Sequence, residues 1–65
     1  MNKLRAKLVE QGMRVEDLCE RAGISRNAYY NRIRTGPGSF RIHEVRAIAE
    51  VLALTPEEIR EIFFS

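Results

Sequence analysis

Residues 23–36, with the sequence GISRNAYYNRIRTG, concentrate side chains that carry positive charge or donate hydrogen bonds. The segment contains three arginines, two tyrosines and two asparagines, and it has no acidic residue. Guanidinium groups bind phosphates and guanine edges through paired hydrogen bonds, and an asparagine amide can do the same with adenine. The chemistry available to this segment is therefore the binding of a polyanion.

The charge of the whole chain is also unevenly distributed. Residues 1–36 hold eight basic and four acidic residues, a balance of +4, whereas residues 37–65 hold three basic and five acidic ones, a balance of −2. This asymmetry predicts that one face of the protein meets a polyanion. On charge alone, an uneven but merely solvated surface is the alternative.

The size and composition of the chain exclude several classes of function. A chain of 65 residues forms one domain, 1–65, near the lower limit for a core without disulfides or metal. Its one cysteine, Cys19, and one histidine, His43, provide neither a disulfide nor a zinc or redox site, so we expect no cofactor and no metal. There is no phosphate-binding glycine loop, signal peptide or long apolar run, and we therefore expect a cytoplasmic, non-enzymatic protein without a small-molecule substrate or a membrane partner.

Helical periodicity must supply the elements that position the basic segment. Ser25 is expected to cap one helix, and Thr55 another through a capping box with Glu58. Gly12 and Gly23 are expected to end two helices, and no strand pattern occurs. The predicted fold is therefore all-α, with a loop at 35–39 and helices near 2–11, 15–22, 25–34, 42–52 and 55–64.

The second and third predicted helices have the spacing of a helix-turn-helix. Cys19 is small where the helices would cross, Gly23 allows the positive φ of the turn, and Ile24 would fill the corner. Tyr29 and Ile33, four residues apart, are expected to face the core. Glycine-linked helix pairs also occur in purely structural bundles, but the basic outer side favours binding.

These motifs resemble the Cro/CI-type helix-turn-helix domain of phage repressors and their bacterial relatives. The resemblance is carried by MRVEDLCERAGISRNAYYNRIRTG with its flanking segments NKLRAKLVEQG and RIHEVRAIAEVLALTPEEI, and it covers nearly the whole chain. AYYNRI and EIREIFF most resemble small, single-domain, phage-encoded Cro-like members. The resemblance implies a compact five-helix, lambda-repressor-like domain that regulates transcription. Such a domain reads the major groove of double-stranded DNA with its third helix, usually as a dimer on a partly palindromic operator.

The resemblance also assigns roles to individual side chains. The base contacts that it implies are Arg26, Asn27, Tyr30 and Asn31. The contacts to the DNA backbone are expected at Arg14 and Arg41, which precede helix N-termini, and at Ser25, Arg32 and Arg34 of the third helix. Local capping is the alternative for Asn27, and solvated charge is the alternative for Arg32 and Arg34.

Two helix starts depart from the family pattern. Many members have Thr-Gln where this chain has Arg14-Val15, and Arg41 stands where a capping Thr is common, with Ser39 as the alternative cap. Each change replaces a cap with a cation, at a cost of roughly 0.5–2 kcal/mol per missing cap. The missing Gln at position 15 slightly favours the alternative function, a protein-binding module such as an antirepressor or adaptor. The arginines of the third helix favour DNA.

The last helix is richer in apolar residues than one face of so short a helix can bury. Ile59 and either Ile62 or Phe63 are expected to close the core. The predicted interface of a weak homodimer comprises Ile62, Phe63 and Phe64. The alternative is that Phe64 folds back over the first helix and completes the core.

Overall fold

Five α-helices and one short 3₁₀ turn form the domain. The computed structural model describes residues 2–64, without the side chains of Asn2 and Pro37. The elements are α1 (Asn2–Glu10), α2 (Val15–Ala22), α3 (Arg26–Thr35), η1 (Pro37–Ser39), α4 (Ile42–Leu52) and α5 (Pro56–Phe63). No strand occurs between residues 2 and 64, so the predicted all-α fold is confirmed.

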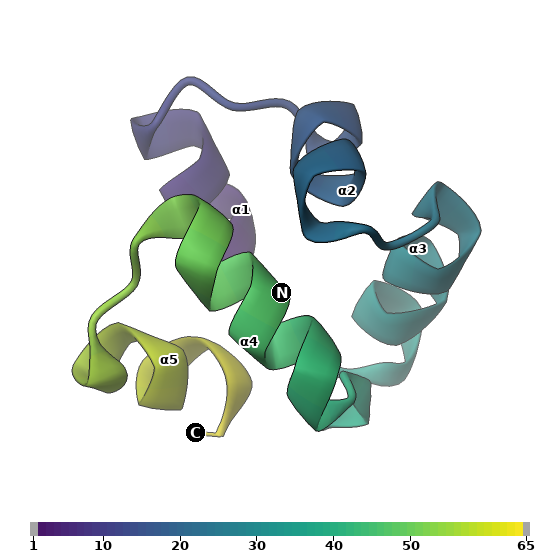
Figure 1. Cartoon of the computed structure of the whole chain (residues 1–65). Helices are drawn as coiled ribbons and strands as arrows, with labels where there is room; N and C mark the ends of the chain where they lie inside the picture. The colour runs from purple at the N-terminus through teal and green to yellow at the C-terminus, as the bar shows by residue number, and fades with distance from the viewer. Residues whose placement is uncertain (1, 65) are drawn as a thin grey trace.

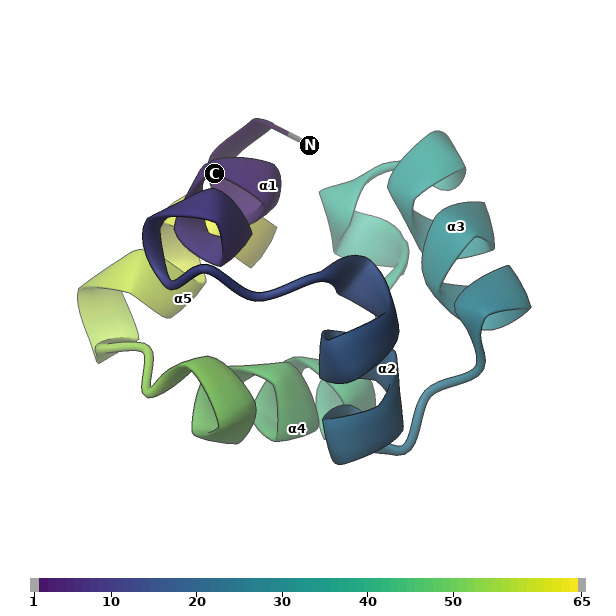
Figure 2. The ribbon, with the colours of Figure 1, turned by 90° about the horizontal axis from the view of Figure 1, so that it is seen from above.

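The helices enclose a core within a molecule of 25 × 25 × 20 Å. In Figure 1, α4 crosses the front of the molecule, with α2 and α3 on one side of it and α5 on the other. The view from above in Figure 2 shows α1 and α5 together on the side of the molecule opposite α3. Helix α2 packs against α3 and α4, and α5 packs against α1 and α4. This arrangement leaves α3 at an edge of the molecule.

Buried apolar side chains from every helix and from the segment before α4 form one core. The core consists of Leu4, Leu8, Leu18, Cys19, Ile24, Tyr29, Phe40, Val45, Ile48, Leu52, Ile62 and Phe63. Three of its aromatic rings meet edge to face: Phe40 lies 6.0 Å from Tyr29 and 5.4 Å from Phe63, measured between ring centroids. This geometry is favourable for aromatic pairs, and it joins the inner face of α3 to α5 through the core.

The ends of the helices follow the local signals in the sequence. The Ser25 hydroxyl accepts a hydrogen bond from the Ala28 N–H at 3.1 Å. At the start of α5, Thr55 and Glu58 form the predicted capping box, with hydrogen bonds of 3.2 and 2.9 Å. Gly23 has φ +71°, as the turn between α2 and α3 requires. Helix α4 instead ends at Ala53, a non-glycine residue with φ +53°.

Polar contacts tie the first helix to the last part of the chain. Lys7 of α1 forms an ion pair with Glu58 of α5, and the Gln11 side chain donates to the Leu52 carbonyl oxygen at 2.7 Å. The hydrogen bond between Lys7 and Glu58 is the main reason why the pKa of Lys7 is raised and the pKa of Glu58 is lowered. The side of the domain opposite α3 is thus held by charge as well as by apolar packing.

Candidate nucleic-acid interface

Helix α3 buries one side and exposes the other. Its inner residue Tyr29 is buried among core residues, as predicted. The four side chains predicted to contact bases are all exposed, and they are Arg26, Asn27, Tyr30 and Asn31. Because residues three and four positions apart lie on the same side of a helix, the four side chains form one outward surface. We call these four residues the α3 face.

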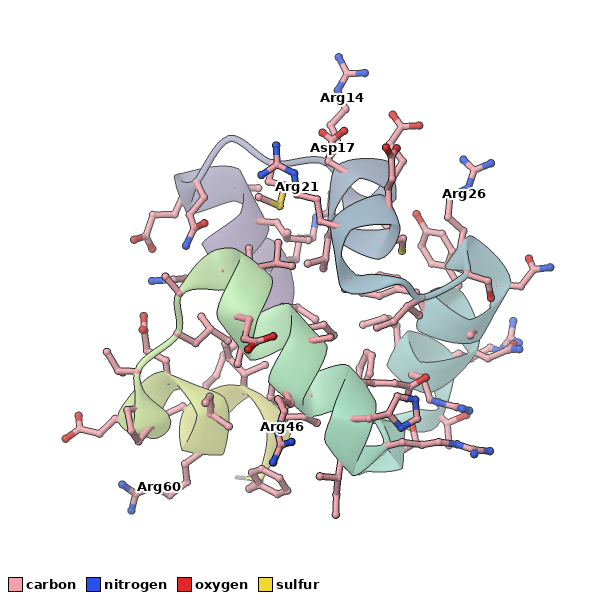
Figure 3. The ribbon with its side chains drawn as sticks, viewed as in Figure 1. Arg14, Asp17, Arg21, Arg26, Arg46 and Arg60 are labelled. Atoms are coloured by element: carbon pink, nitrogen blue, oxygen red, sulfur yellow. The ribbon has the colours of Figure 1, made fainter. Side chains whose placement is uncertain are left out.

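The arginines at the starts of α2 and α3 are exposed and share one exposed carboxylate, that of Glu16. Figure 3 shows Arg14 and Arg26 projecting from the same side of the molecule, whereas Arg46 and Arg60 lie on the other side. Arg26 lies 4.0 Å from Glu16, measured between the charged atoms, and Arg14 lies 3.5 Å from the same carboxylate. All three side chains are exposed, and surface ion pairs of this kind are weak. Little free energy therefore opposes their transfer to a phosphate or a base.

The side chains of Asn27 and Asn31 differ in their local bonding. Ser25, not Asn27, supplies the cap of α3, so the alternative role of Asn27 as a cap is wrong. The Asn31 side-chain oxygen accepts a hydrogen bond from the Arg34 guanidinium, and both residues are exposed. A contact between Asn31 and a base would have to replace or share this bond.

Arg32 has a partner within the protein that the sequence did not predict. Its Nε donates to Oε1 of Glu44 at 3.1 Å, and Glu44 is only 5% exposed. The same Oε1 atom accepts the backbone N–H of Arg41 at 2.8 Å. Burial opposes the charge of Glu44, but the bonds from Arg41 and Arg32 outweigh it and lower its pKa. The only sequence signal for Glu44 was an acid three residues after Arg41, in the first turn of a helix.

The starts of α2 and α4 lack the side-chain acceptor that caps many helices. The residues at these two cap positions are Arg14 and Arg41, and neither side chain makes a capping hydrogen bond, because arginine has no acceptor. An acid in the first turn binds the backbone N–H of each cap residue instead: Asp17 at 3.4 Å in α2 and Glu44 in α4. The N–H groups that a Ser or Thr cap would bind thus have no side-chain partner at either start.

Ser39 does not act as the alternative cap of α4. Its hydroxyl lies 3.0 Å from the carbonyl oxygen of Arg32 and also donates toward that of Gly36. This interpretation of Ser39 is therefore corrected: the side chain fastens η1 to the end of α3. In Figure 1, α2 begins beyond one end of α3 and α4 begins near the other.

The predicted dimer residues divide between the core and the surface. Ile62 and Phe63 are buried in the monomer, which corrects their assignment to an interface, because a partner cannot reach them in this conformation. Phe64 is 66% exposed, so it does not complete the core as the alternative required. Since α5 is amphipathic, its inward stripe includes both Ile62 and Phe63 and leaves Phe64 outside.

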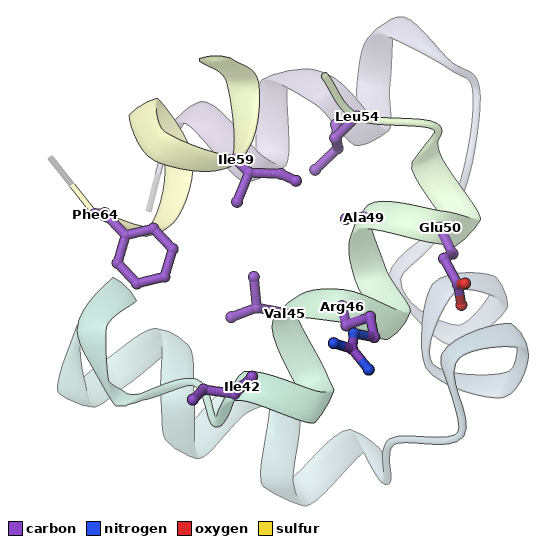
Figure 4. Close-up of a pocket in the computed structure, with 8 residues that line it drawn as sticks. All are labelled: Ile42, Val45, Arg46, Ala49, Glu50, Leu54, Ile59 and Phe64. Carbon is purple, nitrogen blue, oxygen red and sulfur yellow. The ribbon is translucent and has the colours of Figure 1, made fainter. Parts of the chain in front are cut away.

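Phe64 borders an apolar groove between α4 and α5. The groove has a volume of about 520 Å³, and it is lined by Ile42, Val45, Arg46, Ala49, Glu50, Leu54, Ile59 and Phe64 (Figure 4). Ile42, at one end of the groove, is 82% exposed. Arg46 and Glu50 are the charged residues of this lining and stand one turn apart on α4. The groove thus contains two of the large apolar side chains that are exposed in the described part of the chain, while Val9 and Tyr30 are exposed elsewhere.

Neither a cluster of metal-binding side chains nor a membrane-spanning helix occurs among the described residues. Between residues 2 and 64, no group of three or more His, Cys, Asp or Glu side chains is placed to hold a metal ion. In the same part of the chain, no helix is long and apolar enough to cross a bilayer.

Comparison with protein families gives one match that spans almost the whole domain. The model of the Cro/C1-type HTH DNA-binding domain matches residues 3–64. Comparisons with curated proteins and with solved structures gave no match. The matched residues include the α3 face and both uncapped helix starts.

Proposed function

The chain belongs to the Cro/C1-type helix-turn-helix DNA-binding family, and from this premise we propose that it is a Cro-like repressor of a phage or prophage. In this proposal α3 enters the major groove of a partly palindromic operator, and repression follows from occupancy of the site. The observation that carries the proposal is the α3 face: four polar side chains are exposed together, while Tyr29 fixes the opposite side of the helix in the core. A helix held in this way presents its donors without having to be ordered on binding.

The chemistry of the α3 face supports direct reading of base edges. Arg26 is suited to bind O6 and N7 of guanine, and Asn27 is suited to bind N6 and N7 of adenine. Tyr30 offers a ring for a thymine methyl group and a hydroxyl for a phosphate. Arg34, near the end of α3, is assigned to the DNA backbone together with Ser25, so these two position the helix and carry no sequence information.

The two uncapped helix starts are assigned to phosphates on either side of the groove. Each start combines an exposed arginine, Arg14 or Arg41, with N–H groups that have no side-chain acceptor. The positive end of a helix dipole favours an anion at such a position. A phosphate would thus supply the acceptor that the missing Thr supplies in many family members.

We assign the dimer contact to the groove between α4 and α5. Exposed Ile42 and Phe64 give two copies an apolar surface to share. Under a two-fold axis, Arg46 of each copy can face Glu50 of the other, which makes the groove self-complementary in charge. The surface is small, so we expect the free dimer to be weak and the DNA to assemble it by holding two copies about one helical turn apart.

The proposal is tested by selecting the preferred site from random duplexes and then measuring variants on it. Arg26→Ala should weaken binding to the selected site by roughly 1–3 kcal/mol and relax specificity at one base position. Arg34→Ala should weaken binding to all DNA sequences about equally, because a phosphate contact does not depend on the base sequence. The matched control is Arg60→Ala, which removes an arginine from the other side of the molecule and should leave selectivity unchanged.

Two results would contradict the proposal. Equal affinity of Arg26→Ala and the parent for the selected site would remove Arg26 from base reading. A parent protein that shows no salt-dependent binding to any duplex would exclude DNA as the ligand and favour the protein-binding module, since phosphate contacts always make binding depend on salt.

A further inference from the structure

We infer that Glu44 is a positioning residue, which fixes α3 relative to the start of α4 and thereby sets the selectivity of the domain for its operator. The inference rests on the proposed function, because it concerns how two parts of one DNA surface are held together. Glu44 itself is buried and does not reach the DNA surface.

A single carboxylate oxygen joins the two elements. Oε1 of Glu44 accepts Nε–H of Arg32, on the last turns of α3, at 3.1 Å, and it accepts the backbone N–H of Arg41, before α4, at 2.8 Å. Both bonds end on a charged acceptor, and such bonds are stronger than neutral ones. The atom therefore constrains the distance between the recognition helix and the start of α4 directly.

Burial makes this constraint stiff. A carboxylate that is 5% exposed cannot exchange its partners for water without a large loss of free energy, so movement of α3 away from α4 is opposed. Ser39 adds a second link by bonding the carbonyl oxygen of Arg32 at 3.0 Å. The end of α3 is thus fixed through both the side chain and the backbone of Arg32.

The constraint acts on two contacts that must be made simultaneously. In the proposed complex, the α3 face meets base edges while Arg41 and the start of α4 meet a phosphate, and phosphate contacts set the register of base reading. Specific binding requires that both contacts form at the same time, with α3 and the start of α4 in a fixed relative position. Binding to generic DNA depends mainly on the number of cations and much less on their exact placement. Loosening the link should therefore lower affinity for the selected site more than affinity for other sequences.

The experiment compares Glu44→Ala and Arg32→Met with the parent on the selected duplex and on a generic duplex. The ratio of the two affinities should fall about tenfold in each variant, which is the size expected when one bidentate bond to a base is removed. Glu44→Gln keeps an acceptor oxygen, so its affinity ratio should lie between that of Glu44→Ala and that of the parent. The matched control is Glu57→Ala, an exposed acid in the first turn of α5, which removes the same charge and should shift both affinities equally.

Circular dichroism on the same samples shows which variants are folded. Only folded variants are compared, so a lower affinity ratio cannot be caused by unfolding. If Glu44→Ala is unfolded at the assay temperature, Glu44→Gln and Arg32→Met decide the outcome. The inference is overturned if the folded variants keep the ratio of the parent. It is also overturned if Arg32→Met weakens both duplexes equally and flattens the salt slope by about 0.9, since Arg32 is then a phosphate contact. A parent without any preference among duplexes contradicts the proposed function instead, so the two failures are distinguishable.

Discussion

Phe63 and Phe64 are adjacent in the sequence, yet their replacement by alanine should have opposite consequences. Phe63 is 2% exposed and packs on Phe40, whereas Phe64 is 66% exposed on the rim of the α4–α5 groove. Truncation of a buried Phe costs about 3–5 kcal/mol. A domain of this length has a total stability of roughly 3–10 kcal/mol. Phe63→Ala should therefore remove much or all of the stability of the monomer.

The expected cost of Phe64→Ala to the monomer is much smaller. Complete burial of a Phe side chain contributes about 1.5–3 kcal/mol, and only about a third of this residue is buried, so the loss should be about 0.5–1 kcal/mol. A change of this size lowers the melting temperature of a small domain by about 2–8 °C. Phe64→Ala should remain folded, and its main effect should appear where two copies meet.

The assay is a titration of each variant on a full operator and on an isolated half-site. If Phe64 anchors the dimer, its removal should lower cooperative binding to the full site about tenfold, as for a typical interface anchor, and leave half-site affinity unchanged. Unchanged cooperativity in a folded Phe64→Ala protein would refute the assignment of the groove to the dimer. Unfolding comparable to that of Phe63→Ala would instead place Phe64 in the core.

Three further predictions concern helix ends and a buried tyrosine. Replacing Arg14 and Arg41 with Thr should make the slope of log K against log salt shallower by about 0.9 for each phosphate that the protein no longer binds, and an unchanged slope would show that the two arginines point elsewhere. Ala53→Gly should stabilise the domain by about 0.5–1 kcal/mol in urea unfolding, because φ +53° disfavours a side chain, and a lower midpoint would contradict this. Burial, followed by the charges of Cys19 and Tyr30, raises the pKa of Tyr29 to about 12, so its stability contribution should be complete below pH 10 and disappear as the pH rises toward about 12. In Tyr30→Phe, which retains Tyr29 as the sole tyrosine but removes the smallest cause of the shift, the midpoint of tyrosinate absorbance should stay well above 10 because burial remains, and a midpoint near 10 would contradict this.

The parts of the structure that the sequence predicted are those controlled by neighbouring residues. The caps at Ser25 and Thr55 and the turn at Gly23 involve groups only a few positions apart, so residue type and spacing were sufficient. The set of α5 residues that face the core was predicted incompletely, because only one of Ile62 and Phe63 was expected to be buried. Both are buried.

The contact between Arg32 and Glu44 was beyond prediction for a different reason. The two residues are twelve positions apart and meet because the segment through η1 brings the start of α4 to the end of α3. The sequence indicates which side of each helix is apolar, but the placement of the end of α3 beside the start of α4 depends on the whole core, including the rings of Tyr29, Phe40 and Phe63. A charged pair between two such helix ends is therefore visible only in three dimensions.

The packing of α1 against α5 has a consequence for synthesis of the protein on the ribosome. Leu4 and Leu8 are translated well before Ile62 and Phe63, which belong to the same core, and Lys7 is translated well before its partner Glu58. A nascent chain that lacks α5 has an open core and little to hold α3 in its orientation, because a small domain has no stability to spare. Premature termination before α5 should therefore yield fragments that are degraded by proteases and do not compete for DNA.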